Sequence, residues 1–130
     1  MSDAHAQAGA SILVDPAGMA WSPTKFPGIA IKVLYQDQAT GLLTALFRWA
    51  PGAVLPDHEH VQIEQTYVLE GSLEDEEGEV SAGQYVARPA GSRHVARSPR
   101  GALILAVFLE PNRFFLADGT AERFDTAPAR

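Results

Sequence analysis

The stretch Gly52-Ala-Val-Leu-Pro-Asp-His58-Glu-His60-Val-Gln-Ile-Glu64 places three candidate metal ligands within one short segment. His58 and His60 are two residues apart, so on an extended strand their side chains leave the same face. Glu64 keeps the same even spacing and can join them if the strand continues or bends slightly. Pro56 argues against a helix across this segment. The spacing therefore predicts a metal site on a β-strand.

A further candidate ligand, His94, follows behind Pro89 and Gly91, well separated along the chain from the first group. His94 must reach the same ion from a different strand, so the site would be formed by tertiary structure rather than by one local loop. Imidazole and carboxylate ligands together suit zinc, iron, manganese or nickel. We therefore expect one divalent transition metal.

Composition narrows the class of protein and of partner. A chain of 130 residues supports one domain with a real core. The formal net charge is −6 with only 10 Lys and Arg residues, which argues against a nucleic-acid partner. The absence of cysteine excludes disulfides, thiolate zinc sites and a cysteine nucleophile. No apolar run approaches the roughly 20 residues that span a bilayer, and no signal peptide is evident, so we expect a cytoplasmic protein with no membrane partner.

Short apolar segments alternate with glycine and proline turn signals along most of the chain, which is typical of an all-β sandwich or barrel. The acidic run Glu74–Glu77 is interpreted as a solvated turn. The expected strands are Ile29–Tyr35, Leu42–Ala50, Gln62–Glu70, Leu73–Asp75, Glu79–Val80, Gly83–Arg88, His94–Ala96 and Leu103–Glu110.

The chain is expected to divide into three parts. Residues 1–20 form an N-terminal tail that is partly disordered, with a short strand at Ser11–Val14. Residues 21–116 form the β-barrel. Residues 117–130 form a C-terminal tail or a short helix, centred near Ala121.

Two motifs resemble those of the cupin superfamily. Gly52-x5-His58-x-His60-x3-Glu64-x6-Gly71 resembles the first cupin motif, and Gly83-x5-Pro89-x-Gly91-x2-His94 resembles the second. The family often has Asn four residues after the last histidine, where this chain has Ser98. A looser likeness to the anti-sigma-factor (ChrR-type) cupin subgroup and its ketone-cleaving dioxygenase relatives is carried by Trp21, Pro27-Gly28, Lys32–Leu34, Leu46–Gly52 and Tyr67–Gly71.

The resemblance implies a cupin double-stranded β-helix (jelly-roll) barrel made from two facing sheets, with the metal inside near one mouth. By motif position the ligands are His58, His60, Glu64 and His94. In the alternative interpretation, Glu64 stands off and acts as a catalytic base beside a three-histidine metal. Iron is expected if the protein is an enzyme, with zinc, manganese or nickel as alternatives.

Two functions follow from the resemblance. The first is a mononuclear, iron-type dioxygenase-like enzyme acting on a small enolisable ketone or a similar organic molecule. The second is a non-catalytic metal-bound sensor or small-molecule-binding cupin related to zinc anti-sigma-factor domains. Those proteins carry a helical sigma-binding domain ahead of the cupin, whereas the residues before Trp21 are irregular here, which favours the enzyme.

Candidates for the substrate pocket come from alternation along the expected strands. An inward Arg48 would bind a substrate carboxylate or enolate, and an outward one would form a salt bridge. Outward-facing Tyr67 and Leu69 are expected to pack against a second subunit in a homodimer. The candidates for the pocket, some of which ordinary core packing or a bulging loop would equally explain, are Arg48, Gln62, Thr66, Tyr85 and Phe108.

Overall fold

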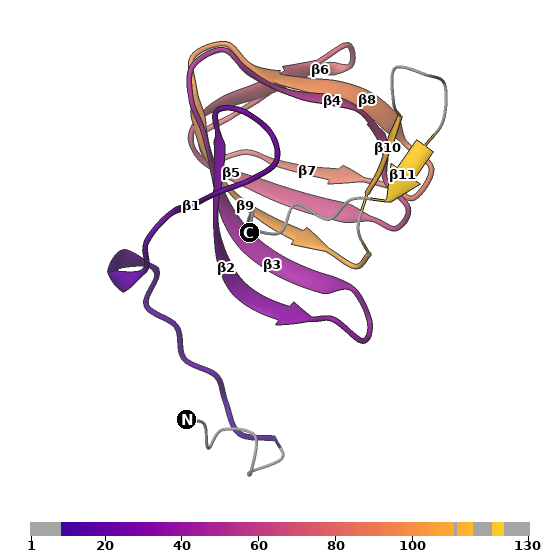
Figure 1. Cartoon of the computed structure of the whole chain (residues 1–130). Coiled ribbons are helices and arrows are strands. Elements are labelled where there is room, and N and C mark those ends of the chain that lie inside the picture. Colours follow the sequence, from indigo (N-terminus) through magenta and orange to yellow (C-terminus); the bar gives the residue numbers. More distant parts are fainter. Residues whose placement is uncertain (1–8, 111, 116–120, 124–130) are drawn as a thin grey trace.

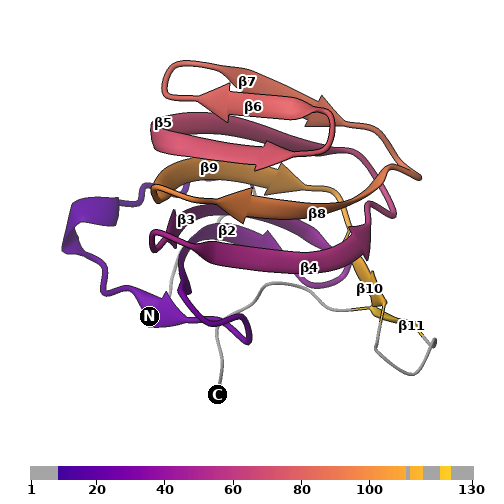
Figure 2. The same ribbon diagram turned by 90° about the horizontal axis from the view of Figure 1, so that it is seen from above.

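The computed structural model describes residues 9–110, 112–115 and 121–123, which form an all-β structure as the sequence predicts. Antiparallel strands curl into a barrel with two facing layers (Figures 1 and 2). No helix in this part of the chain has the length and hydropathy needed to span a bilayer. After a short 3-10 turn, η2 (Pro16–Gly18), the strands are β1 (Ser22–Pro23), β2 (Ile29–Asp37), β3 (Leu42–Trp49), β4 (Ala53–Glu59), β5 (Glu64–Asp75), β6 (Gly78–Ser81), β7 (Tyr85–Arg88), β8 (Arg93–Ser98), β9 (Ala102–Phe108), β10 (Arg113–Phe115) and β11 (Ala121–Arg123).

The two layers share their longest strand. The first sheet has the order β1-β2-β3-β9-β5-β7, and the second has β6-β5-β8-β4-β10-β11, with every pair antiparallel. β5 passes from one sheet to the other near Gly71, where the chain has a φ of 71°. A Cβ at this position would lie 2.0 Å from the carbonyl oxygen of Gly101, so only glycine fits the crossing.

The core lies between the two sheets and follows from alternation along the strands. On β3 the residues Leu43, Ala45, Phe47 and Trp49 are buried, whereas Arg48 is exposed. β9 shows the same pattern, with buried residues at alternate positions from Ala102 to Phe108. The apolar inner faces therefore hold the barrel together.

The structure corrects the sequence predictions at both ends of the chain. Ser11–Val14 is not a strand, and this segment leaves the barrel as an extended arm (Figure 1). Residues Ala121–Arg123 form strand β11 against β10 rather than a helix. The two strands expected at 62–70 and 73–75 are one strand, because the chain stays paired through the crossing at Gly71. The disorder expected within residues 1–20 and most of the expected C-terminal tail lie outside the described residues.

Candidate metal centre

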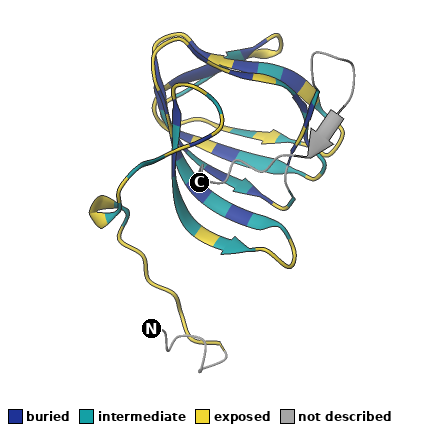
Figure 3. Cartoon of the chain, viewed as in Figure 1, coloured by how far each residue is buried: buried dark blue, intermediate teal, exposed yellow. Residues whose placement is uncertain are grey.

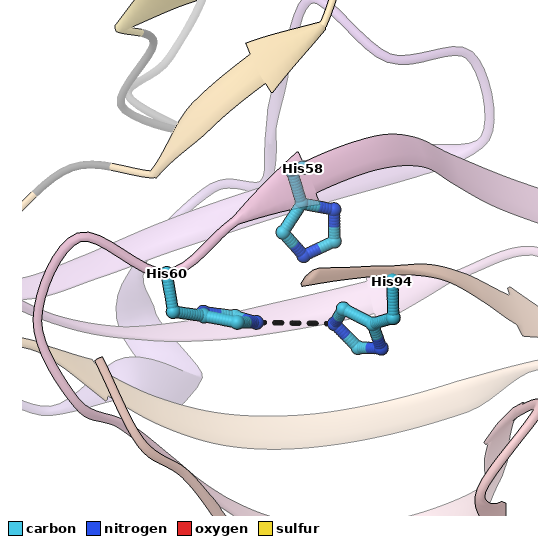
Figure 4. A group of neighbouring side chains, drawn as sticks. All are labelled: His58, His60 and His94. Atoms are coloured by element: carbon cyan, nitrogen blue, oxygen red, sulfur yellow. Dashed lines mark hydrogen bonds between the residues drawn. The ribbon is translucent and has the colours of Figure 1, made fainter. Parts of the chain in front are cut away.

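Three histidines meet inside the barrel, at one end of the β4–β8 ladder. His58 on β4 is the register partner of His94 on β8, and His60 follows directly after β4. One ring nitrogen from each of the three residues lies within 4.8 Å of the others. All three side chains are buried, and Figure 4 shows their rings turned toward a common point. Two adjacent strands and the following bend thus bring together residues that are far apart in sequence.

The nitrogen of each ring that faces away from this point has an acceptor beside it. The Nδ1 atom of His58 donates to the carbonyl oxygen of Pro56 at 2.7 Å, and that of His94 to Asp75 Oδ2 at 2.7 Å. The Nδ1 atom of His60 lies 3.0 Å from Glu64 Oε1, although the direction departs from that of a straight hydrogen bond. These acceptors assign the proton of each neutral ring to Nδ1, so that Nε2 presents a lone pair to the centre.

This arrangement fits a bound cation. The Nε2 atoms of His60 and His94 face each other at 3.1 Å (Figure 4), and two lone pairs at that distance repel unless a proton or a cation lies between them. Burial lowers the pKa of His58 from its ordinary 6.5 to about 4, against the opposing effect of its hydrogen bond to Pro56. Neutral imidazole is the form that binds a metal. Three converging imidazoles suit a divalent transition metal and leave other positions open.

Glu64 stands beside the three histidines rather than among the converging nitrogens. Its Oε2 atom accepts a hydrogen bond of 2.9 Å from the hydroxyl of Thr66. Burial acts to raise the pKa of Glu64, but the contact with His60 and the hydrogen bond from the Thr66 hydroxyl outweigh it and hold the pKa below its ordinary value. The side chain is therefore an ionised carboxylate at neutral pH, placed next to the candidate centre.

Asp75 is a site residue that the sequence interpretation missed, because the whole run Glu74–Glu77 was expected to be solvated. It is buried, and its carboxylate contacts His94 Nδ1 and lies 2.9 Å from Arg88 Nη1. The Oδ1 atom also accepts from the backbone N–H groups of Glu77 and Gly78. Side-chain alternation could have identified it, because Asp75 lies two residues after the buried Leu73 on the same strand and therefore faces the same side.

An aromatic side chain closes one wall of the centre. Phe114 on β10 is the register partner of His58, and its ring centroid lies 5.2 Å from the imidazole. Phe26 stacks on Phe114, with centroids 4.9 Å apart. Outside this wall, the salt bridge between Arg113 and Glu59 joins β10 to β4. The apolar wall separates the imidazoles from bulk water.

Two of the five predicted pocket residues point into the barrel. Thr66 is buried and contacts Glu64. Phe108 is also buried, and its ring packs edge-on against Phe47 with centroids 6.0 Å apart. Thr66 lies beside the candidate centre through Glu64, and Phe108 belongs to the core.

The other three predicted pocket residues lie outside the barrel. Arg48 is exposed and 3.9 Å from Glu70, because alternation on β3 directs it away from the core. Gln62 is exposed in the bend between β4 and β5, so the even spacing that places it beside His60 is lost there. Tyr85 is 54% exposed, and its hydroxyl donates to Gln65 Oε1 at 2.6 Å.

A cavity of about 610 Å³ lies at the opposite end of the barrel from the histidines. It borders the end of the β4–β8 ladder where Ala53 pairs with Ser98, whereas His58 pairs with His94 at the other end. Arg48, Glu70 and Arg100 are the charged residues in its walls, and most of the rest of the lining is apolar. None of the three histidines lines this cavity, although Phe26, which stacks on Phe114, forms part of its wall.

Comparison with known families now identifies the fold. A family model described as the ChrR Cupin-like domain matches residues 9–113. The chain belongs to the ChrR cupin-like domain family. This match confirms the resemblance expected from the two histidine motifs. No curated protein matches the chain significantly.

Solved structures share this cupin fold. A protein of unknown function with a cupin-like fold from Ralstonia eutropha JMP134 is 29% identical, with a TM-score of 0.68 over 74% of this chain. The match covers 64% of that protein, so the cupin described here spans less than two thirds of its length. An acetylacetone dioxygenase from Acinetobacter johnsonii is 20% identical, with a TM-score of 0.74 over 94% of this chain and 87% of its own. The complex of Rhodobacter sphaeroides SigE with the anti-sigma ChrR gives 24% identity and a TM-score of 0.61, over 71% of this chain and 49% of the matched one.

Proposed function

We propose that this cupin is a mononuclear metal-dependent enzyme of the dioxygenase type, acting on a small enolisable ketone or a similar organic molecule. His58, His60 and His94 hold one divalent transition metal, iron in the active enzyme. The observation that carries the proposal is the convergence of three buried imidazoles whose outer nitrogens each have an acceptor beside them. A closed structural zinc site has four protein ligands, whereas three leave room for a substrate.

The chemistry divides between the ion and the chain. An iron ion bound by the three histidines would supply a Lewis acid and a redox centre for reaction with dioxygen. The protein supplies a base, because Glu64 is ionised and lies beside the centre. A proton on the carbon next to a ketone can pass to this carboxylate, which forms the enolate of the substrate. The Thr66 hydroxyl orients the carboxylate for that transfer.

The substrate class is supported by two observations. An ionised carboxylate beside a buried centre with an aromatic wall at Phe114 suits a neutral substrate with an acidic C–H bond, because a charged substrate would lose its hydration without a partner. The similarity in fold to the acetylacetone dioxygenase of Acinetobacter johnsonii points to the same class, since acetylacetone is a small enolisable diketone. We therefore favour β-diketones and hydroxyaryl ketones as the first compounds to test.

The test combines metal content with oxygen consumption. Elemental analysis of protein purified without added metal identifies the resident ion. Oxygen uptake by the iron-loaded protein is then measured with a panel of β-diketones and hydroxyacetophenones, with zinc-loaded protein as the control. We expect uptake that depends on both iron and substrate. A fully iron-loaded protein that consumes no oxygen with any compound of a broad panel would disprove the dioxygenase proposal.

A metal-bound sensor is the second candidate function. The family description and the similarity to a chain of the SigE–ChrR complex support it. A sensor would retain zinc rather than iron on purification, and it would bind small molecules at the centre without turning them over. The same elemental analysis and oxygen measurement therefore separate the two candidates.

A further inference from the structure

The N-terminal arm, residues 10–15, carries apolar side chains into solvent. This segment is neither helix nor strand, and it extends away from the barrel (Figure 3). Ile12, Leu13 and Val14 are 60%, 89% and 42% exposed. Three consecutive apolar residues on an extended segment would usually be covered in a folded protein. The arm thus has the composition of a strand or an interface segment, and no element among the described residues pairs with it.

The arm is firmly attached at its base. The ammonium group of Lys32 on β2 donates to the carbonyl oxygen of Pro16 at 2.8 Å. Asp15 caps the η2 turn, accepting from the backbone N–H of Ala17 at 3.2 Å. The ring of Trp21 lies 4.7 Å below the same ammonium group. These contacts fix where the arm begins, beside the outer surface of the first sheet.

The outer face of the first sheet also carries apolar side chains, beside the charged Arg48 and Glu70. One row across this face begins at Lys32 and continues through register partners on β3, β9, β5 and β7. An antiparallel sheet with one buried face usually turns polar residues outward. Here the row consists of Lys32, Leu46, Leu105, Tyr67 and Tyr85, and further exposed apolar residues on the sheet's outer surface are Tyr35 and Leu69.

We propose that the arm of one copy packs against the outer face of the first sheet of a second copy, and that the exchange is reciprocal. The arm and the face are complementary, because both present apolar groups to solvent in the single chain. The reach is adequate, since six extended residues span about 20 Å, which is about four strand spacings of 4.8 Å. The base of the arm is held by Lys32, which lies at the end of the apolar row. If two copies face each other across a twofold axis over this sheet, the arm of each copy lies on the apolar row of the other.

The reaction at the metal centre plays no part in this proposal. The first test is the mass of the full chain in solution, measured by sedimentation equilibrium and light scattering. We expect a dimer of twice 14.0 kDa. The double variant Ile12→Asp, Leu13→Asp should raise the dissociation constant of the dimer at least about tenfold, because two buried apolar side chains become charged.

The matched control is Val54→Asp, on the second sheet. Val54 is 44% exposed, close to the values on the proposed interface, and lies on β4. This variant should leave the dissociation constant unchanged. A monomeric wild-type chain, or a dimer that is equally stable in the arm variant, would overturn the proposal.

Disulfide trapping tests where the arm lies. The chain has no cysteine, so introduced pairs are the only thiols. Leu13→Cys is combined in one chain with Tyr35→Cys, Tyr67→Cys or Tyr85→Cys, and oxidised protein is separated on a non-reducing gel. We expect a covalent dimer with at least one of the three pairs, and none with Leu13→Cys alone or paired with Val54→Cys. An intrachain disulfide at monomer mass, or no crosslink with any pair, would refute arm exchange.

Discussion

His58 is buried without charge, so lowering the pH of the metal-free protein should destabilise the barrel. Its pKa in the folded protein is about 4, against 6.5 for an exposed histidine, and burial is the main cause. The unfolded chain therefore binds this proton more readily than the folded chain does. The contribution to stability is fully present above pH 6.5 and is lost as the pH falls toward 4.

The size of the effect follows from the two pKa values. Below both of them the loss amounts to about 3 kcal/mol, of which about 2 kcal/mol falls between pH 7 and pH 5. The pKa of His94 is also lowered, by burial and by Arg88, so it adds a loss in the same direction. Glu64 and Asp75 titrate below this window, because their pKa values lie under the ordinary carboxylate values.

The assay is urea unfolding of chelator-treated protein at pH 7 and pH 5, followed by circular dichroism. The free energy of unfolding should fall by about 2 kcal/mol or more between the two pH values. The control variant, His58→Gln, lacks the titrating ring, and its loss over the same interval should be smaller by about 2 kcal/mol. The reasoning fails if the wild-type stability is equal at the two pH values, or if the variant loses as much as the parent.

Three further predictions concern the metal. His58→Ala and His94→Ala should each abolish tight metal binding in equilibrium dialysis while the circular dichroism spectrum stays that of a β-protein. Asp75→Asn should weaken metal affinity about 10- to 100-fold by releasing His94, and Glu76→Gln, an exposed carboxylate on the same turn, should leave affinity unchanged in the same titration. Glu64→Gln should retain the metal but lose turnover of any substrate found in the oxygen assay; loss of the metal would instead assign Glu64 as a ligand.

The sequence predicts those parts of the fold in which the direction of a side chain depends only on its position along its own strand. Alternation on β3 separates an apolar set from one that contains Arg48, and the structure buries the apolar set. The spacing of His58 and His60, with the motif around His94, predicted that two separate segments of the chain meet at one centre, as they do. Local periodicity suffices there because an antiparallel ladder keeps side chains in register.

The predictions failed where a residue's place depends on contacts from elsewhere in the fold. Gln62 lies two residues after His60, which on a continuous strand would direct both side chains to the same face. The chain bends between β4 and β5 instead, so this alternation is lost and Gln62 is exposed. Asp75 resembles its solvated neighbours in sequence, but its side-chain partners, His94 on β8 and Arg88 on β7, come from other strands. Ser11–Val14 has the composition of a strand, yet a strand needs a neighbour, and its own barrel provides none among the described residues.

The two carboxylates next to the histidines differ in how firmly they are held, and we propose that this difference separates their roles. Asp75 contacts His94, Arg88 and two backbone N–H groups, so its carboxylate cannot rotate without breaking several interactions. Glu64 is held by the Thr66 hydroxyl and by a poorly aligned contact with His60. A small rotation of Glu64 would therefore bring it to a metal or to a substrate proton at low cost. Asp75 is suited to orient a ligand, and Glu64 to change partners during a reaction.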